Sequence, residues 1–142
     1  MELVKKQADR LIFFGVLLLL IGLITGLLVP LLKNPRMGVS SHIEGVLNGM
    51  LLVIFGLIWP KLSISDKWLK VAFWLAVYGT FMNWLGILVA AIFDGGAMLN
   101  ILADGKESTV AVEGFVTFAL LSLSIAMITC SIIILIGLKK RP

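Results

Sequence analysis

The run LIFFGVLLLLIGLITGLLVPLL, Leu11 to Leu32, decides the fold class of this chain. It has about 22 residues and no charge, and a helix of that length, rising 1.5 Å per residue, crosses the roughly 30 Å of hydrocarbon in a bilayer. Because lipid offers no partners for backbone N–H and C=O groups, a segment that crosses it must be helical. The run therefore predicts a membrane-spanning helix.

Three further runs have the same character: Met37 to Pro60, Trp68 to Phe93 and Thr109 to Leu138. Of the 142 residues, 60% are hydrophobic and 14% are charged, which leaves no room for a separate soluble domain. We therefore predict an all-α integral membrane protein. It is a single domain, a bundle of four transmembrane helices that span approximately residues 11–32, 37–60, 68–93 and 109–138.

The basic residues are distributed unequally between the two ends of these helices. One end has Lys5, Lys6, Arg10, Lys61, Lys67, Lys70, Lys139, Lys140 and Arg141, and the other has Lys33, Arg36 and Lys106. This asymmetry predicts that both termini of a multi-pass protein are cytoplasmic. We expect the membrane to be the bacterial inner membrane. The first run lacks a small-residue cleavage pattern, so we expect it to be retained. The net charge of +4 follows from these anchors and does not indicate nucleic-acid binding.

Common catalytic and metal-binding motifs are absent from the sequence. Cys130 is the only cysteine, which excludes an intramolecular disulfide and a CxxC metal site, and we expect it to serve packing. There is no Walker loop, GxGxxG, GxSxG or HExxH.

Residues 94–108 are predicted to form a solvated surface loop. Three tryptophans are predicted to lie at the membrane interface, namely Trp59, Trp68 and Trp74.

Polar residues inside the predicted spans carry most of the functional information. His42, the only histidine, is expected about one turn below the outer boundary, and Asn48 and Asn83 each about 15 Å from the outer surface. Glu113, near the start of the fourth helix, is expected at the depth of His42. Ionisable residues inside a membrane are rare and functional by default. We therefore predict a site where polar groups of three helices converge in the outer half of the bilayer.

The second helix has two neighbouring stripes at 100° per residue. One contains His42, Gly45, Gly49 and Gly56, and the other contains Ser41, Glu44 and Asn48. A histidine above glycines leaves a shallow trough, which suits either a closely packed helix or a flat macrocycle held through its metal by the imidazole. Spacing does not choose between these. Glycine stripes, including the Gly22 to Gly26 GxxxG pair, more often pack helices, and a lone histidine is as often bonded to a nearby carboxylate.

The run NPRMGVSSHIEGVLNGMLLVIFGLIWP, Asn34 to Pro60, resembles the second-helix region of hydroxylaminobenzene mutases and, more distantly, of membrane-bound styrene oxide isomerases. In both families a histidine is followed six residues later by Asn-Gly-Met or a similar triplet, as His42 is here. The resemblance implies a small four-helix enzyme that assembles as a homotrimer and binds haem b between subunits. It also implies that His42 is the iron ligand and that a second subunit completes the pocket.

The resemblance guides the assignment of site residues. The predicted cofactor-binding residues are His42, Gly45, Gly49 and Arg36, with Arg36 and Lys33 placed to meet the haem propionates. Asn48 and Asn83 are predicted to orient the substrate. Phe55, Phe81 and Trp84 are available to shape an apolar slot. Glu44 and Glu113 are predicted either to move protons or to accept a hydrogen bond from the second ring nitrogen of His42.

The implied reaction is an isomerisation without net electron transfer. Ferric haem is expected to act as a Lewis acid on a hydroxylaminobenzene-type aryl hydroxylamine and to give a 2-aminophenol. The epoxide isomerases have an acidic residue four positions before the third-helix asparagine and a tyrosine four after it. This chain has Gly79 and Ile87 there, so the mutase is preferred.

Three alternatives to the mutase remain. One is an epoxide isomerase like styrene oxide isomerase. Another is a small four-span multidrug transporter in which Glu44 or Glu113 couples proton exchange. The third is a haem protein for electron transfer, but a single histidine supplies only one axial ligand, so an open coordination position is the simpler expectation.

Overall fold

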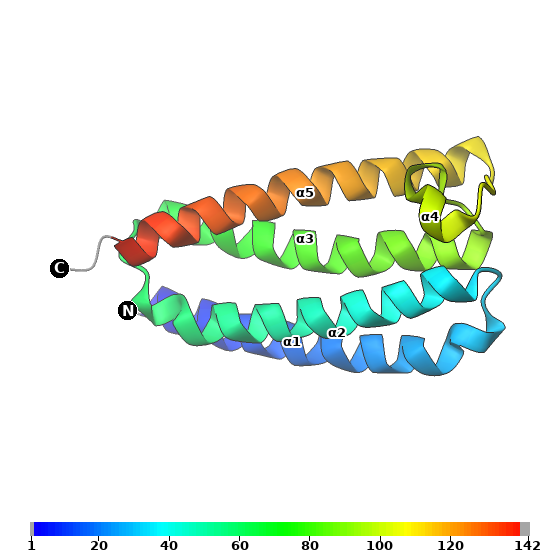
Figure 1. Ribbon diagram of the computed structural model, residues 1–142. Helices are drawn as coiled ribbons and strands as arrows, with labels where there is room; N and C mark the ends of the chain where they lie inside the picture. The colour runs from blue at the N-terminus through cyan, green and yellow to red at the C-terminus, as the bar shows by residue number, and fades with distance from the viewer. Residues whose placement is uncertain (1, 140–142) are drawn as a thin grey trace.

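The protein is built from four long helices. The computed structural model describes residues 2–139, and this part of the chain contains helices and no strand. The long helices are α1 (Glu2–Leu28), α2 (Pro35–Ile58), α3 (Asp66–Phe93) and α5 (Val110–Lys139). All four are long and apolar enough to cross a membrane, as the sequence predicts. The start of α1, the end of α5 and the α2–α3 connection lie at one end of the molecule (Figure 1).

Local sequence signals set most of the helix ends. The helix α1 begins at Glu2, well before the predicted span, because charged side chains limit burial in lipid but do not interrupt a helix. The 3₁₀ turns η1 (Val29–Leu31) and η2 (Trp59–Lys61) each contain a proline and end the first two helices. Asn34 caps α2, its side-chain oxygen accepting the N–H of Met37 at 3.2 Å. At the end of α3, Asp94 adopts a left-handed conformation.

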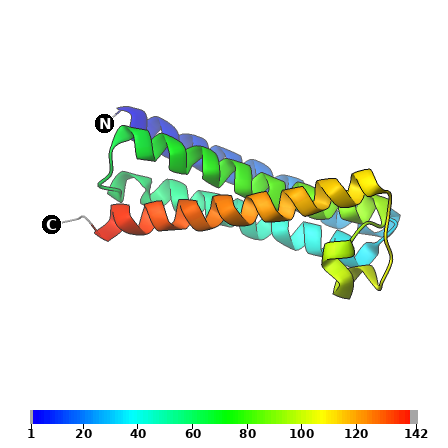
Figure 2. The ribbon, with the colours of Figure 1, turned by 90° about the horizontal axis from the view of Figure 1, so that it is seen from above.

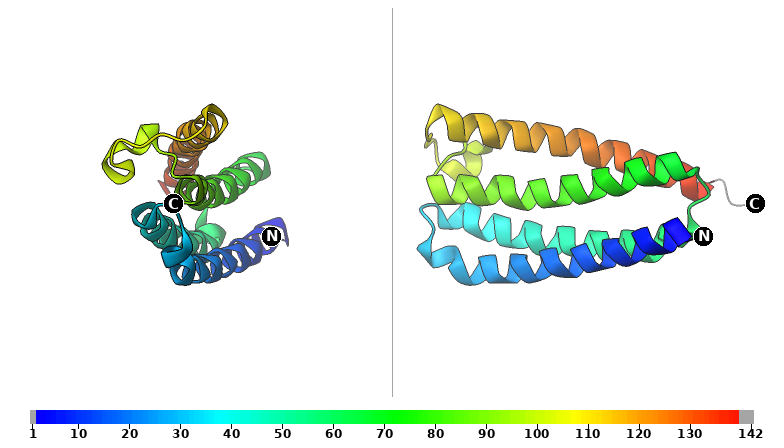
Figure 3. Two further views of the ribbon diagram at one scale, coloured as in Figure 1. Left: turned by 90° about the vertical axis from the view of Figure 1, so that its right-hand side faces the viewer. Right: turned by 180° about the vertical axis from the view of Figure 1, so that it is seen from behind.

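The helices pack in chain order and do not form a closed ring. The helix α1 lies along α2, α2 along α3, and α3 along α5. The end-on view in Figure 3 shows α1 and α5 on opposite sides, with α5 attached through α3. The outward surface of α5 is apolar and exposed, for example at Ile125 and Leu135. Such a surface fits lipid or another protein subunit.

Glycines bring the backbones of α1 and α2 into direct contact. A Cβ atom at Gly45 would lie 2.6 Å from the Cα of Gly22, and one at Gly49 would lie 2.6 Å from the backbone nitrogen of Leu19. The trough predicted on the second helix is therefore filled by α1. Helix packing accounts for Gly45 and Gly49, and we do not place them in a cofactor pocket.

The core near the chain termini is centred on Trp59, which is fully buried. Its Nε1–H donates to Oε1 of Gln7, also buried, at 3.1 Å. This hydrogen bond satisfies the indole N–H inside the protein, so Trp59 packs in the core and does not present its ring outward as a residue of an aromatic belt would. Trp68 and Trp74 are exposed. Cys130 is buried against α3, where its thiol donates to the carbonyl of Ala72, which fits the expected packing role.

The connection between α3 and α5 lies at the end of the bundle opposite the termini and projects to one side of it (Figure 2). It contains the 3₁₀ turn η3 (Ala97–Leu99) and the short helix α4 (Asn100–Ala103). The Asn34 amide donates to Asp94 at 3.1 Å and to the carbonyl of Leu102 at 3.2 Å, and Lys106 forms an ion pair with Asp94 at 3.4 Å. The predicted surface loop is therefore tied to the start of α2.

The α1–α2 contact predicts unequal effects of two glycine substitutions. Gly45→Ala should lower the free energy of unfolding by about 1–3 kcal/mol, because the new methyl meets backbone that cannot move aside alone. Gly114→Ala is the matched control: it is also in a long helix, and no atom lies within 4 Å of the added Cβ. Thermal unfolding of the purified variants in detergent measures the difference. Equal stability of the two would contradict the close contact.

Candidate functional site

His42 of α2 points at α1, and its ring has one defined hydrogen bond. Nδ1 lies 2.8 Å from the backbone oxygen of Gly22. Because a carbonyl only accepts, Nδ1 must carry the hydrogen, which leaves Nε2 with a free lone pair in the neutral ring. Within residues 2–139 the ring makes no other hydrogen bond, and the side chain is partly exposed. A ring held in this way can act as a metal ligand through Nε2.

Gly26 makes the contact between His42 and Gly22 possible. A Cβ atom at Gly26 would lie 2.7 Å from Nδ1 of His42, in the space that the ring occupies. The GxxxG pair therefore exposes a backbone oxygen in addition to packing helices. The expectation that Glu44 or Glu113 bonds the second nitrogen of His42 is wrong, because the acceptor is a main-chain carbonyl.

Glu44, Asn48 and Asn83 form a compact polar cluster between α2 and α3. Oε2 of Glu44 accepts the amide of Asn83 at 2.6 Å and the amide of Asn48 at 3.0 Å. The Asn48 amide also donates to the backbone oxygen of Glu44 at 2.8 Å. Three of the four predicted catalytic residues thus lie together. No hydrogen bond to Oε1 of Glu44 is made from the described part of the chain.

The hydrogen bonds of this cluster give Asn48 and Asn83 a different role from the one predicted. Both side chains direct N–H groups at the Glu44 carboxylate, whereas the sequence suggested that they orient substrate directly. A carboxylate that accepts amide hydrogen bonds is fixed in direction. Asn48 and Asn83 therefore position Glu44.

Two further polar contacts join α1 and α2 to α3 close to this cluster. Ser41 donates to the backbone oxygen of Trp84 at 3.1 Å, and the Trp84 indole donates to the hydroxyl of Thr25 at 3.0 Å. Sequence reasoning named Ser41 and Trp84 but missed Thr25. The signal that could have found it is its place inside the GxxxG segment of α1, which must approach α2 closely.

Glu113 does not join the cluster. Its carboxylate accepts three backbone N–H groups, from Gly96 at 2.9 Å, Ala97 at 2.9 Å and Ser108 at 2.8 Å. Depth alone placed it beside His42, but the side chain turns toward the α3–α5 connection. The predicted convergence of the second, third and fourth helices is therefore correct for α2 and α3 but wrong for the fourth, α5. The polar contacts join α1, α2 and α3, and Glu113 instead holds the connection to the first turn of α5.

His42 and Glu44 face opposite sides of α2. Two positions along a helix correspond to a rotation of about 200°. The contacts agree with this rotation, since His42 reaches α1 and Glu44 reaches α3. Arg36 is exposed at the start of α2, about 9 Å above His42 along the axis. Within one chain, the free ring nitrogen and the carboxylate therefore do not share a surface.

Comparison with known proteins identifies the family. A family model described as styrene oxide isomerase matches residues 7–139. The chain is 52% identical to hydroxylaminobenzene mutase HabA of Ectopseudomonas oleovorans over 127 residues, which cover 89% of this chain and 94% of that protein. It is 49% identical to hydroxylaminobenzene mutase HabB of the same organism over 136 residues, 95% of this chain and 83% of that protein. No solved structure matches.

These matches define the class of the protein, an enzyme that catalyses an isomerisation of the mutase type. The chain belongs to the styrene oxide isomerase family, and the resemblance to the hydroxylaminobenzene mutases is confirmed over most of its length. The four apolar helices together with this family indicate a membrane protein.

Because Glu113 binds the α3–α5 connection and Glu44 does not, substitution of only Glu113 should destabilise that connection. Glu113→Ala removes the acceptor of three backbone N–H groups, so amide hydrogen exchange in residues 95–109 should rise by about tenfold or more. Glu44→Ala is the matched control and should leave that segment unchanged. Mass spectrometry of deuterated, full-length protein in detergent measures both. Unchanged exchange in the Glu113 variant would contradict the assigned role.

Proposed function

We propose that this protein is a haem-dependent membrane isomerase that converts hydroxylaminobenzene-type aryl hydroxylamines into 2-aminophenols. The observation that carries the proposal is the His42 ring, held by Gly22 so that Nε2 remains free, in a chain about half identical to two hydroxylaminobenzene mutases. In the reaction the N–O bond breaks and the oxygen bonds to the ortho carbon. The ring loses its ortho proton, the nitrogen gains one, and no oxidant or reductant is needed.

The residues around His42 fit haem b better than a bare metal ion. Among residues 2–139, no three His, Cys, Asp or Glu side chains are grouped so that they could hold a metal. A porphyrin supplies four nitrogen ligands itself and needs only one from the protein. Arg36 and Lys33, both exposed at the outer end, would meet the propionates. When bound, ferric haem would supply a Lewis acid that weakens the N–O bond.

Glu44 is the residue we assign to proton transfer. Its Oε2 is fixed by Asn48 and Asn83, while Oε1 is free to take the ortho proton from the ring and return a proton to the nitrogen. In Glu113, by contrast, both oxygens already accept backbone N–H groups. The contrast favours Glu44 and leaves Glu113 a structural role.

The opposite orientations of His42 and Glu44 support a site shared between subunits. In a cyclic trimer each subunit presents one surface to the preceding copy and a different surface to the next. The His42 side of one copy would then meet the Glu44 side of its neighbour, with haem b and the aromatic substrate between them. A site inside the membrane also excludes water from the reactive intermediate. With both termini cytoplasmic, as the basic residues favour, these sites lie in the outer half of a bacterial inner membrane.

The haem assignment is tested by removing the imidazole and adding it back. His42→Gly protein from haem-replete cells should lose the Soret absorption and the conversion of phenylhydroxylamine to 2-aminophenol, and free imidazole should restore both in part because it can enter the vacated space. Absorption spectra and product analysis of purified protein, without added reductant, provide the readouts. Wild-type protein that is folded and colourless would overturn the proposal, and turnover of styrene oxide alone would assign the epoxide reaction.

The shared site is tested by mixing two inactive chains. Glu44→Gln alone should lower kcat by about a hundredfold or more. When His42→Gly and Glu44→Gln chains are co-expressed, about a quarter of the interfaces in randomly mixed trimers should combine an intact His42 with an intact Glu44 from a different chain, and activity should return to that extent. The same variants assembled separately and then combined are the control. Absence of recovery in co-purified mixed oligomers would contradict a shared site.

A further inference from the structure

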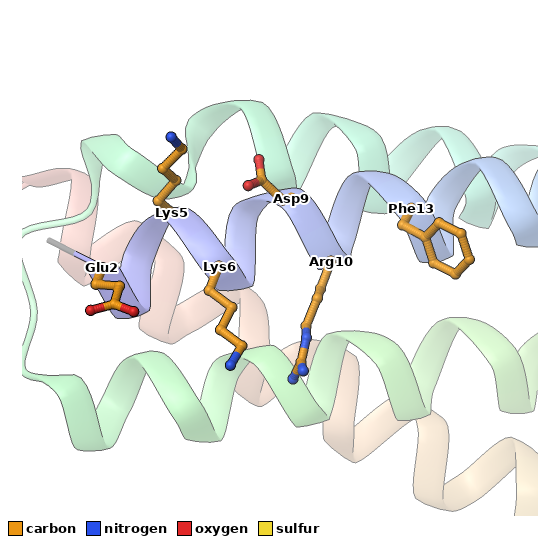
Figure 4. Close-up of a pocket in the computed structure, with 6 residues that line it drawn as sticks. All are labelled: Glu2, Lys5, Lys6, Asp9, Arg10 and Phe13. Carbon is orange, nitrogen blue, oxygen red and sulfur yellow. The ribbon is translucent and has the colours of Figure 1, made fainter.

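A basic groove lies between the first turns of α1 and α3, at the end of the molecule opposite the polar cluster. It has a volume of about 220 Å³, and its lining includes Lys6, Arg10 and Lys70. Figure 4 shows Lys6 and Arg10 extending from the same side of α1, while Lys5 and Asp9 point to the other side. Two helices thus direct three cations into one small space.

These three cations lack carboxylate partners. Within residues 2–139 the one ion pair with N···O of 4.0 Å or less joins Lys106 to Asp94, at the other end of the molecule. Glu2 and Asp9 line an adjoining hollow together with Lys6 and Arg10, and neither makes such a contact. Like charges held close together repel one another, and a bound anion relieves that repulsion. The groove therefore favours an anionic ligand.

The buried side chain of Gln7 adds a neutral donor to the groove. Gln7 lines the groove and is 6% exposed. Because the Trp59 indole can only donate, Oε1 of Gln7 must face it, and the NH₂ group occupies the other end of the amide. This NH₂ group makes no hydrogen bond to the described part of the chain. It is oriented by Trp59 to donate to an anion.

Apolar surface adjoins the cations. Phe73 and the exposed Trp74 also line the groove, and Phe13, 64% exposed, follows Arg10 on α1. Cations and a tryptophan beside an apolar helix surface match the boundary between headgroups and acyl chains. A free phosphate would use only the charged part of this surface, whereas a phospholipid would use both parts.

We propose that this groove binds the phosphate of an anionic phospholipid headgroup, with the acyl chains lying over Trp74 and Phe13. Lys6, Arg10 and Lys70 supply the charge, and Gln7 donates a directional hydrogen bond. The site is separate from the proposed catalytic residues, so it does not depend on the reaction. A lipid bound there would link the first turns of α1 and α3 to the leaflet at the end of the molecule where the chain termini lie.

The test is a titration of full-length protein in a neutral detergent, followed by thermal unfolding at constant ionic strength. Phosphatidylglycerol should raise Tm and saturate, while phosphatidylcholine and inorganic phosphate should not. The variant Lys6→Gln, Arg10→Gln, Lys70→Gln should need at least about tenfold more phosphatidylglycerol for half of the effect, since each cation near an anionic lipid contributes about fivefold. The variant Trp74→Ala should also weaken the response, because it removes the acyl-chain contact.

The matched control removes the same charge from the same end of the molecule. The variant Lys5→Gln, Lys61→Gln, Lys67→Gln changes three exposed lysines outside the groove and should respond to phosphatidylglycerol as the wild type does. An equal loss in this control would show general surface attraction and overturn the site. Stabilisation by inorganic phosphate alone would overturn the lipid as its ligand.

Discussion

The hydrogen bond between the His42 ring and the Gly22 carbonyl depends on two helices that touch without side chains between them. In an α-helix that carbonyl already accepts one N–H from its own turn, and its second lone pair is usually screened by neighbouring side chains. Here Gly26 leaves it open, and the contact between Gly22 and Gly45 brings α2 close enough to reach it. Backbone packing thus determines which ring nitrogen carries the proton.

The remaining buried polar groups extend this arrangement into one connected layer. Trp84 links α3 to Thr25 of α1 and to Ser41 of α2, and Asn83 links α3 to Glu44. In lipid an unpaired polar group costs several kcal/mol, so this pairing fixes the mutual positions of the first three helices. The helix α5 contributes nothing to the layer and packs mainly along α3, with further contacts to the α2–α3 connection at Gly137 and to η3. Its attachment combines apolar contacts with three hydrogen bonds, between Cys130 and the carbonyl of Ala72, between Tyr78 and Ser122, and between the Ser63 N–H and the carbonyl of Gly137. Glu113 holds the connection, and the opposite side of α5 stays open to lipid or a neighbouring copy.

Sequence periodicity was sufficient for the helices and for the order of polar residues along them, but not for the direction of those residues. Run length and charge locate all four helices, and the equal depth predicted for Asn48 and Asn83 agrees with their sharing one partner, Glu44. Depth alone placed Glu113 beside His42, but its side chain binds the α3–α5 connection, because direction depends on which helices are neighbours. The glycine stripe was ambiguous for the same reason, since a smooth surface suits a helix or a macrocycle equally. The hydrogen-bond partner of His42 could not be predicted, because every residue has a main-chain carbonyl and the sequence does not show which one is accessible.

The geometry of α2 also bears on why such a site would be placed between copies. A helix with its side chains is about 10 Å wide, and His42 and Glu44 extend from opposite sides of it. A small substrate held on the Nε2 side of α2 cannot reach around the helix to the carboxylate of the same chain. If both groups take part in one reaction, each must therefore act with its counterpart from another chain. Catalysis would then require assembly, and the isolated chain would hold both halves of the site without being able to combine them.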